Sequence, residues 1–222
     1  MDRKNLVLVG GGGHCKSVIE VAESAGYSIA GILDVPEEIG KKVLAYTVIG
    51  SDEDIQRYAD SALFLVTVGH IKDPALRIRL HEKIRATGGQ LATLIAPTAH
   101  VSKYARIGSG SVIMHQAMVN ADAQIGQGCI INTFANIEHD VVIEDYCHVS
   151  TGAMVNGNCL VGAGTFLGSQ SVVVNGVSVE QGCVIGAGSL VRKNIRIKGI
   201  YSGNPAIPVS YTHLRAHETR RH

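Results

Sequence analysis

Residues 113–143 read IMHQAMVNADAQIGQGCIINTFANIEHDVVI, and every sixth position of this stretch, from Ile113 to Ile143, is Ile or Val. The same spacing continues without a miss from Ile95 to Ile197, where every sixth residue is Ile, Val or Leu. An α-helix repeats every 3.6 residues or so and a strand every two, so neither sustains this period. A solenoid of short stacked strands does. The repeat predicts a prism with three hexapeptides per turn and branched aliphatic side chains in its interior.

A small residue precedes the repeating aliphatic by two positions in most hexapeptides, which suits the tight corners of such a prism. Four of the five cysteines occupy this position, namely Cys129, Cys147, Cys159 and Cys183. We interpret them as small buried side chains. The chain has no CxxC pair, and its cysteine count is odd, so neither a zinc site nor a disulfide framework is predicted. We expect no metal.

Residues 1–91 have a different rhythm and predict a separate domain. Apolar runs at 5–9, 29–33 and 62–68 alternate with helical patterns at 16–25 and 74–86. This order is typical of a parallel α/β, Rossmann-like unit. The expected organisation is therefore an α/β domain over 1–91 and the solenoid over 92–209.

The first predicted strand is followed by Gly10, Gly11, Gly12, Gly13 and His14. A glycine-rich turn before a helix presents backbone N–H groups to a phosphate. Asp34 ends the second strand, where a ribose-binding carboxylate belongs in such units. The GxGxxG pattern is incomplete, so a mononucleotide or nucleotide-sugar is favoured over a dinucleotide. A tight turn without a ligand is the alternative.

Two histidines interrupt the repeats. His139 lies between Glu138 and Asp140, and a carboxylate partner would make it a stronger base. One 18-residue coil later comes Gly157, which would leave room for a substrate and expose an N–H to an oxyanion. His139 as a surface residue is the alternative, as is an exposed or interface role for His148. With no Ser or Cys in a nucleophile context, direct transfer is favoured over an acyl-enzyme.

A family resemblance rests on several motifs taken together. They are Val9 to His14, Leu33-Asp34, Thr67-Val68-Gly69, Ile131-Asn132-Thr133, Ile137 to Asp140, His148 to Ala153 and Gly203 to Ala206. The chain over 4–206 resembles the left-handed β-helix sugar acetyltransferases of bacterial surface glycan synthesis. These include the UDP-4-amino-sugar N-acetyltransferases and the sialic acid O-acetyltransferases.

The resemblance implies a left-handed β-helix and a homotrimer that binds acetyl-CoA between neighbouring subunits. It implies that His139 is the general base, oriented by Glu138 and Asp140, and that the Gly157 amide is the oxyanion donor. His148 and Gly168 would join Gly157 in binding the coenzyme. The nucleotide-sugar site would comprise the following residues: Gly10, Gly11, Gly12, Gly13, His14, Asp34 and Gly69.

Two positions depart from the family pattern. Many relatives carry two acidic residues after the second strand, whereas this chain has Asp34-Val35. A basic residue normally follows the Gly-x-Pro-Ala motif, but Ile207-Pro208 follows here. Residues 210–222, SYTHLRAHETRRH, match nothing in the family and resemble translated sequencing-adapter read-through. We expect an artefactual, disordered tail there.

The bulk properties limit the possible partners. The net charge of +1 and the pI of about 7.7 argue against a nucleic-acid partner. The sequence shows no apolar run of the roughly 18 residues that a membrane span needs, and no signal-peptide pattern, so a cytoplasmic protein is expected. The predicted activity is acetyl-CoA-dependent N-acetylation of a UDP-linked 4-amino sugar. Alternatives are O-acetylation of a sialic acid and a trimeric nucleotide-binding scaffold without turnover.

Overall fold

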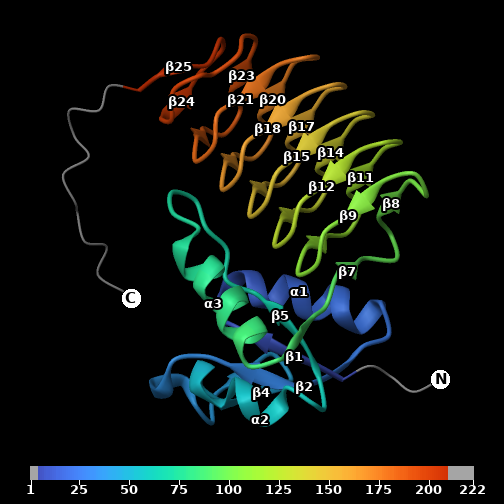
Figure 1. The fold of residues 1–222 in the computed structure, drawn as a ribbon, viewed down its shortest axis with the longest axis vertical. Coiled ribbons are helices and arrows are strands. Elements are labelled where there is room, and N and C mark those ends of the chain that lie inside the picture. The colour runs from blue at the N-terminus through green and yellow to red at the C-terminus, as the bar shows by residue number, and fades with distance from the viewer. Residues whose placement is uncertain (1–4, 210–222) are drawn as a thin grey trace.

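The computed structural model describes residues 5–209, which form an α/β domain and a β-helix that lie against each other (Figure 1). The tail predicted at 210–222 lies outside the described residues. Within the described range no helix has the length and apolar character needed to cross a membrane.

The N-terminal domain contains a sheet with the strand order β3-β4-β2-β1-β5-β6. Its strands are β1 (Asn5–Val9), β2 (Ser28–Leu33), β3 (Lys42–Val43), β4 (Tyr46–Gly50), β5 (Leu63–Val66) and β6 (Gln90–Leu91). Its helices are α1 (Gly13–Ser24), α2 (Ile55–Tyr58) and α3 (Ala75–Ala86), with 3-10 turns η1 (Pro36–Glu38) and η2 (Asp52–Asp54). β1 pairs in parallel with β2 and β5, which confirms the predicted parallel α/β unit.

The helix α1 begins three residues earlier than the apolar pattern predicts. Gly12 is extended and caps the helix, and Gly13 and His14 already belong to its first turn. The sequence pattern predicts no element between Asp34 and Ala62. The structure places β3, β4 and α2 there: β3 and α2 are too short for a periodicity, and β4, as long as β1, lacks the continuous apolar run of β1.

The second domain is a left-handed parallel β-helix with three sheets. One sheet contains β7 (Leu94–Ile95), β10 (Val112–Ile113), β13 (Ile130–Ile131), β16 (His148–Val149), β19 (Phe166–Leu167), β22 (Val184–Ile185), β24 (Ile200–Ser202) and β25 (Ile207–Pro208). A second contains β8 (His100–Val101), β11 (Met118–Val119), β14 (Asn136–Ile137), β17 (Met154–Val155), β20 (Val172–Val173) and β23 (Leu190–Val191). The third contains β9 (Arg106–Ile107), β12 (Gln124–Ile125), β15 (Val142–Ile143), β18 (Leu160–Val161) and β21 (Ser178–Val179). We call them the first, second and third faces.

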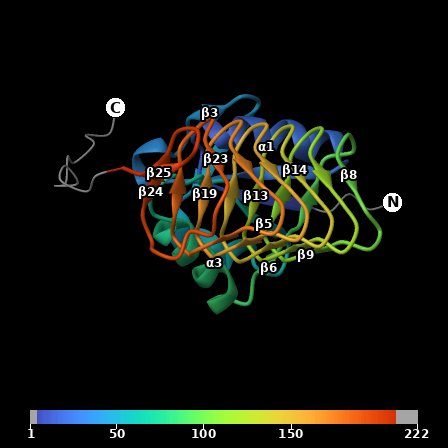
Figure 2. The ribbon, with the colours of Figure 1, turned by 90° about the horizontal axis from the view of Figure 1, so that it is seen from above.

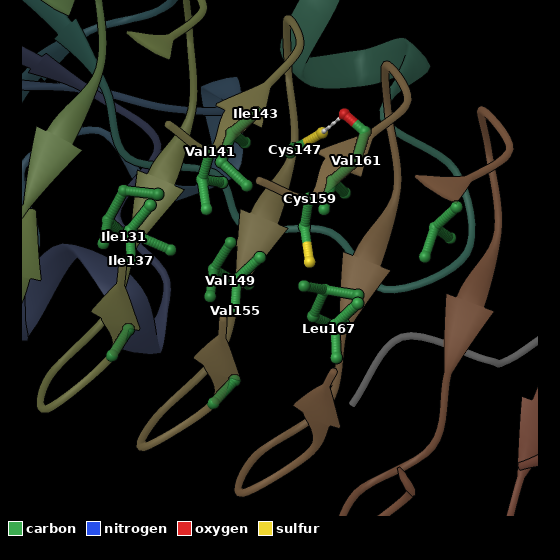
Figure 3. Packing of buried hydrophobic residues seen from close by; sticks show 14 of the residues in the cluster. Ile131, Ile137, Val141, Ile143, Cys147, Val149, Val155, Cys159, Val161 and Leu167 are labelled. Atoms are coloured by element: carbon green, nitrogen blue, oxygen red, sulfur yellow. Dashed lines mark hydrogen bonds between the residues drawn. The ribbon is translucent and has the colours of Figure 1, made fainter. Parts of the chain in front are cut away.

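Each coil pairs with the next in a register of 18 residues, as between Ile113 and Ile131. The repeating aliphatics point into the prism, and those from Ile113 to Ile185 are almost completely buried (Figure 3). The prediction is wrong at the two ends of the series. Ile95 is 38% exposed and Ile197 is 72% exposed. Ile95 pairs in register with the interior residue Ile113, so its exposure comes from its place in the first coil, which no earlier coil covers.

The corner cysteines are buried, as predicted, and they also donate hydrogen bonds. The Cys147 thiol lies 3.2 Å from the Gly162 carbonyl oxygen, and the Cys159 thiol lies 3.0 Å from that of Val174. Burial raises the pKa of Cys147 and of Cys159 above the ordinary thiol value. At neutral pH these thiols therefore stay protonated and satisfy corner carbonyls.

The two domains share one apolar cluster. Val18 and Ile19 of α1 pack with Leu94, Val112 and Ile130 on the outer side of the first face. Figure 2 shows α1 running along the coils beside this face. The N-terminal domain therefore covers the first face at the coils that carry Leu94, Val112 and Ile130.

We expect Ile143→Ala to lower the free energy of unfolding by about 2–5 kcal/mol, because it leaves a cavity in a closely packed interior. Ile143 is fully buried, whereas Leu76 on α3 is 46% exposed. Leu76→Ala is the matched control and should change stability by no more than about 0.5 kcal/mol. Urea unfolding measures both, and equal effects would contradict an interior position for the repeat.

Candidate active site

His139 lies in the turn that follows β14, at the corner between the second and third faces. Its Nδ1 is 2.8 Å from Oδ2 of Asp140, and the two side chains are 58% and 57% exposed. Asp140 has a left-handed backbone, with φ of 59°, a conformation that Asp tolerates better than most residues. An ionised carboxylate only accepts hydrogen bonds, so Nδ1 donates its proton to Asp140 and Nε2 remains as the basic nitrogen.

Gly157 lies directly beside this imidazole, one coil further along, as the sequence predicts. A Cβ atom at position 157 would come 2.7 Å from Cε1 and 2.8 Å from Nε2 of His139. The Gly157 carbonyl accepts from Gly176 N, but within residues 5–209 its N–H has no acceptor. The turn thus places a basic nitrogen next to an unpaired amide donor.

Glu138 differs from its predicted role, because its side chain does not contact the imidazole. Its carboxylate accepts from Asn120 Nδ2 at 3.0 Å and from Asn136 Nδ2 at 3.1 Å. The Asn136 amide, followed by the Asn120 amide and the His139 backbone N–H, holds the pKa of Glu138 below its usual value. Glu138 therefore stays ionised and is held by the two asparagines, and within residues 5–209 the carboxylate that bonds to the ring is that of Asp140.

The glycine turn lies at the carboxyl ends of β1, β2 and β5. Asp34 Oδ2 accepts from the Gly11 N–H at 2.8 Å, and Oδ1 accepts from the Val35 N–H at 2.8 Å. A Cβ at position 11 would come 2.7 Å from Asp34 Oδ2, so glycine is needed for this approach. Gly12 and Gly13 have open space where a side chain would be. The predicted Asp34 thus shapes the turn, and the open amides at the start of α1 suit a phosphate.

His148 lies where the two domains meet, on the outer side of the first face. Its Nδ1 donates to the His70 carbonyl oxygen at 2.9 Å, and its ring lies edge-on against Phe166, with the centroids 5.2 Å apart. The ring of His14, from the glycine turn, has its centroid 6.3 Å away. Gly69 also approaches the His148 ring. We call His14, His70 and His148 the junction histidines.

The junction histidines are held neutral. The pKa of His14 is lowered to about 3, mainly by burial. The charge of Arg77 and the neighbouring His148 lower it further. The pKa of His70 and that of His148 are lowered to about 4, again mainly by burial. The site therefore presents uncharged imidazoles at neutral pH.

The stability of the protein should fall between pH 7 and pH 5. An unfolded histidine has a pKa of about 6.5, so below that value the unfolded chain binds more protons than the folded one. The free energy of unfolding then decreases with falling pH, by up to about 1.4 kcal/mol per pH unit and per histidine. The loss extends down to about pH 4, the folded value of His70 and His148.

Urea unfolding at pH 7, 6 and 5 measures this decrease. His148→Gln should make it shallower, and His100→Gln, which changes an exposed side chain, should leave it unchanged. A free energy of unfolding that stays constant from pH 7 to pH 5 would contradict the prediction.

The structure does not bring all the predicted residues together within one chain. His139 lies at a corner of the second face, whereas His148, the glycine turn and Gly69 lie along the first. Gly168, predicted to bind the coenzyme, is buried, its N–H donates to Ile185 and its carbonyl accepts from Ser171. Its backbone is therefore engaged within the β-helix, which argues against a direct contact with the coenzyme.

Sequence reasoning missed several residues around these sites. Asn120 and Asn136 hold Glu138; Asn120 lies 18 residues, one coil, before Glu138, and this spacing could have indicated their contact. Thr67 donates to the carbonyl oxygens of Val9 and Gly10 and so ties β5 to the glycine turn. Arg77 carried no local signal, since it resembles any basic residue on an amphipathic helix. Among residues 5–209 no group of His, Cys, Asp and Glu has the arrangement of a metal site.

Comparison with protein families matches both parts of the chain. Residues 5–84 match the family described as PglD N-terminal domain. Residues 122–157 and 158–193 each match the family described as bacterial transferase hexapeptide (six repeats). Among curated proteins, the UDP-N-acetylbacillosamine N-acetyltransferase of Bacillus subtilis (strain 168) is 35% identical over 114 residues. That match covers 50% of this chain and 51% of the relative, about half of its length.

Solved structures match over almost the whole chain. The acetyltransferase domain of PglB from Neisseria gonorrhoeae FA1090 has a TM-score of 0.87 and 31% identity, and the match covers 93% of this chain and 100% of that one. A histidine mutant of perosamine N-acetyltransferase from Caulobacter crescentus, in complex with CoA and GDP-perosamine, has a TM-score of 0.88 and 32% identity. That match covers 93% of this chain and 97% of that one. The chain therefore belongs to the hexapeptide-repeat sugar acetyltransferases, with an N-terminal domain of the PglD type.

Proposed function

We propose that the protein transfers an acetyl group from acetyl-CoA to the amine of a UDP-linked 4-amino sugar. The observation that carries the mechanism is the His139–Asp140 pair beside the unpaired Gly157 N–H. The product is an N-acetylated nucleotide sugar for surface glycan synthesis. A reaction that consumes acetyl-CoA and a nucleotide sugar belongs in the cytoplasm.

In the proposed step the sugar nitrogen attacks the thioester carbonyl carbon while Nε2 of His139 accepts the proton from that nitrogen. The Gly157 N–H donates to the oxygen that becomes negative in the tetrahedral intermediate. The carbon–sulfur bond then breaks, and His139 returns the proton to the leaving thiolate. Asp140 stabilises the imidazolium that exists between the two proton transfers.

The nucleotide-sugar is proposed to bind at the glycine turn. The amides at the start of α1 face open space at Gly12 and Gly13, which suits the diphosphate. From there the sugar would extend along the junction histidines. Neutral imidazoles suit this position, because they do not repel a sugar ammonium group before it loses its proton.

A homotrimer would complete the site. Within one chain, His139 and the glycine turn lie on different faces of the β-helix. A second copy therefore has to bring its own His139 toward the junction. The second face carries an outward row of Met118, Met154, Val172 and Leu190, and the two methionines are 39% and 41% exposed. An apolar row beside the His139 corner supports packing between copies at this face.

The test is the release of free coenzyme A thiol from acetyl-CoA. UDP-4-amino-4,6-dideoxy-N-acetylglucosamine, CMP-sialic acid and free sialic acid are compared, with His139→Ala as the control. We expect rapid release with the UDP-amino sugar and little with the other two. Release with a sialic acid alone would make the protein an O-acetyltransferase, and no release with any sugar would favour a non-catalytic scaffold.

A further inference from the structure

Arg77 on α3 is a buried cation that no carboxylate neutralises within the described part of the chain. Its side chain is 1% exposed. All its recorded partners are backbone carbonyl oxygens: Nη1 donates to Val66 at 2.7 Å and Val68 at 2.9 Å, and Nε donates to Gly128 at 2.8 Å. Nη2 lies 3.4 Å from the Gly110 oxygen. Burial lowers its pKa to about 10, so the group remains charged at neutral pH.

These four carbonyl groups belong to both domains. Val66 and Val68 are the carboxyl end of β5, in the α/β domain, whereas Gly110 and Gly128 lie at corners of successive coils. A guanidinium group offers five N–H donors in a rigid plane, so it can hold all four oxygens at fixed angles. Burying a charge without an anion is costly, and here the four carbonyl oxygens offset part of that cost. The side chain thus ties together oxygens of both domains that would otherwise lack this donor.

Two contacts lead from the end of β5 to the substrate site. Thr67, between the two carbonyls that Arg77 holds, donates to the carbonyl oxygens of Val9 and Gly10 at the start of the glycine turn. His70, a few residues later, accepts from His148 on the β-helix. The position of Arg77 thus determines how the glycine turn and His148 face each other.

We propose that Arg77 is a positioning residue that fixes the nucleotide-sugar domain on the β-helix in the orientation needed for sugar binding. The inference rests on the proposed function for its link to substrate. Arg77 touches neither substrate nor reacting atoms. It acts through the β5 carbonyls, and the turns that carry His139 and Gly157, between the second and third faces of the same chain, should be insensitive to it.

The experiment compares Arg77→Lys and Arg77→Met with the matched variants Arg79→Lys and Arg79→Met, which change an exposed residue of the same helix. Lysine keeps the charge but cannot hold four carbonyls in one plane. For Arg77→Lys we expect the KM for the nucleotide-sugar to rise at least about tenfold. The KM for acetyl-CoA should change less than about twofold, as it should for both Arg79 variants.

Amide hydrogen exchange gives a second readout that requires no turnover. In Arg77→Lys, exchange should accelerate at least about tenfold over residues 63–70 and at the start of α1, with residues 136–143 and 154–161, on the second and third faces, unchanged. If wild-type protein shows no turnover with the amino sugar, the proposed function fails, and exchange together with UDP binding still decides the role of Arg77.

Two outcomes would contradict a positioning role for Arg77. A purely structural Arg77 would lower the melting temperature and the active fraction and accelerate exchange evenly over the described residues, but leave both KM values unchanged in Arg77→Lys. A parallel rise of both KM values would also overturn it. If Arg77→Met does not fold, the lysine variant decides alone.

Discussion

Replacing His139 with alanine is expected to lower kcat at least about a hundredfold, because general-base catalysis by a positioned histidine contributes about 10²–10⁴-fold. The side chain is 58% exposed and makes no contact with the core, so the fold and the assembly should be unaffected. Thiol release from acetyl-CoA under saturating nucleotide-sugar measures the change. The melting temperature and the affinity for UDP should match those of the wild type.

His100→Ala is the matched control, since His100 is also an exposed histidine of the second face. It should retain the wild-type kcat. Turnover of His139→Ala close to that of the wild type would remove His139 from the mechanism. A loss of kcat accompanied by a lower melting temperature would point to a structural role instead.

Replacing Gly157 with alanine is expected to lower kcat about a hundredfold without unfolding the protein. The added methyl group would overlap the imidazole, at 2.7 Å from Cε1, and the exposed ring would move outward and leave Asp140. A displacement of about 1 Å at a catalytic group is enough for a loss of this size. The position needs no left-handed backbone, so alanine introduces no strain in the main chain.

The double variant His139→Ala/Gly157→Ala separates the two roles of Gly157. If alanine acts by displacing the imidazole, the double variant should be about as slow as His139→Ala, because the two changes remove one interaction. If the kcat of the double variant falls by the product of the two single losses, Gly157 acts independently, through its N–H. Wild-type kcat in Gly157→Ala would show that neither role applies.

The His139 site could be predicted because a fixed coil length converts sequence distance into spatial distance. Once the repeat sets 18 residues per turn, Gly157 must lie beside His139, and the structure confirms it. The same arithmetic predicted corner positions for the cysteines. It places Asn120 beside Glu138 but could not decide whether Glu138 bonds to the asparagines or to His139, because that choice depends on rotamers.

The junction could not be predicted in this way. His14, His70 and His148 are separated by long stretches of sequence, and their contacts depend on how α1 and α3 dock on the first face. No repeat connects the two domains. The role of Arg77 depends on the same docking, since its partners come from β5 and from two separate coils.

The β-helix, its register and the closeness of His139 to Gly157 can be derived from the amino-acid sequence, because they follow from a period of six that local sterics and burial enforce. The sequence also indicated the parallel α/β unit and its glycine turn from hydrophobic patterns. Tertiary packing then sets which face the α/β domain covers, that Asp140 rather than Glu138 bonds to the imidazole, and that Arg77 joins the domains through backbone carbonyls. Those features arise from contacts between residues distant in sequence, whose energies depend on side-chain geometry that no local pattern encodes.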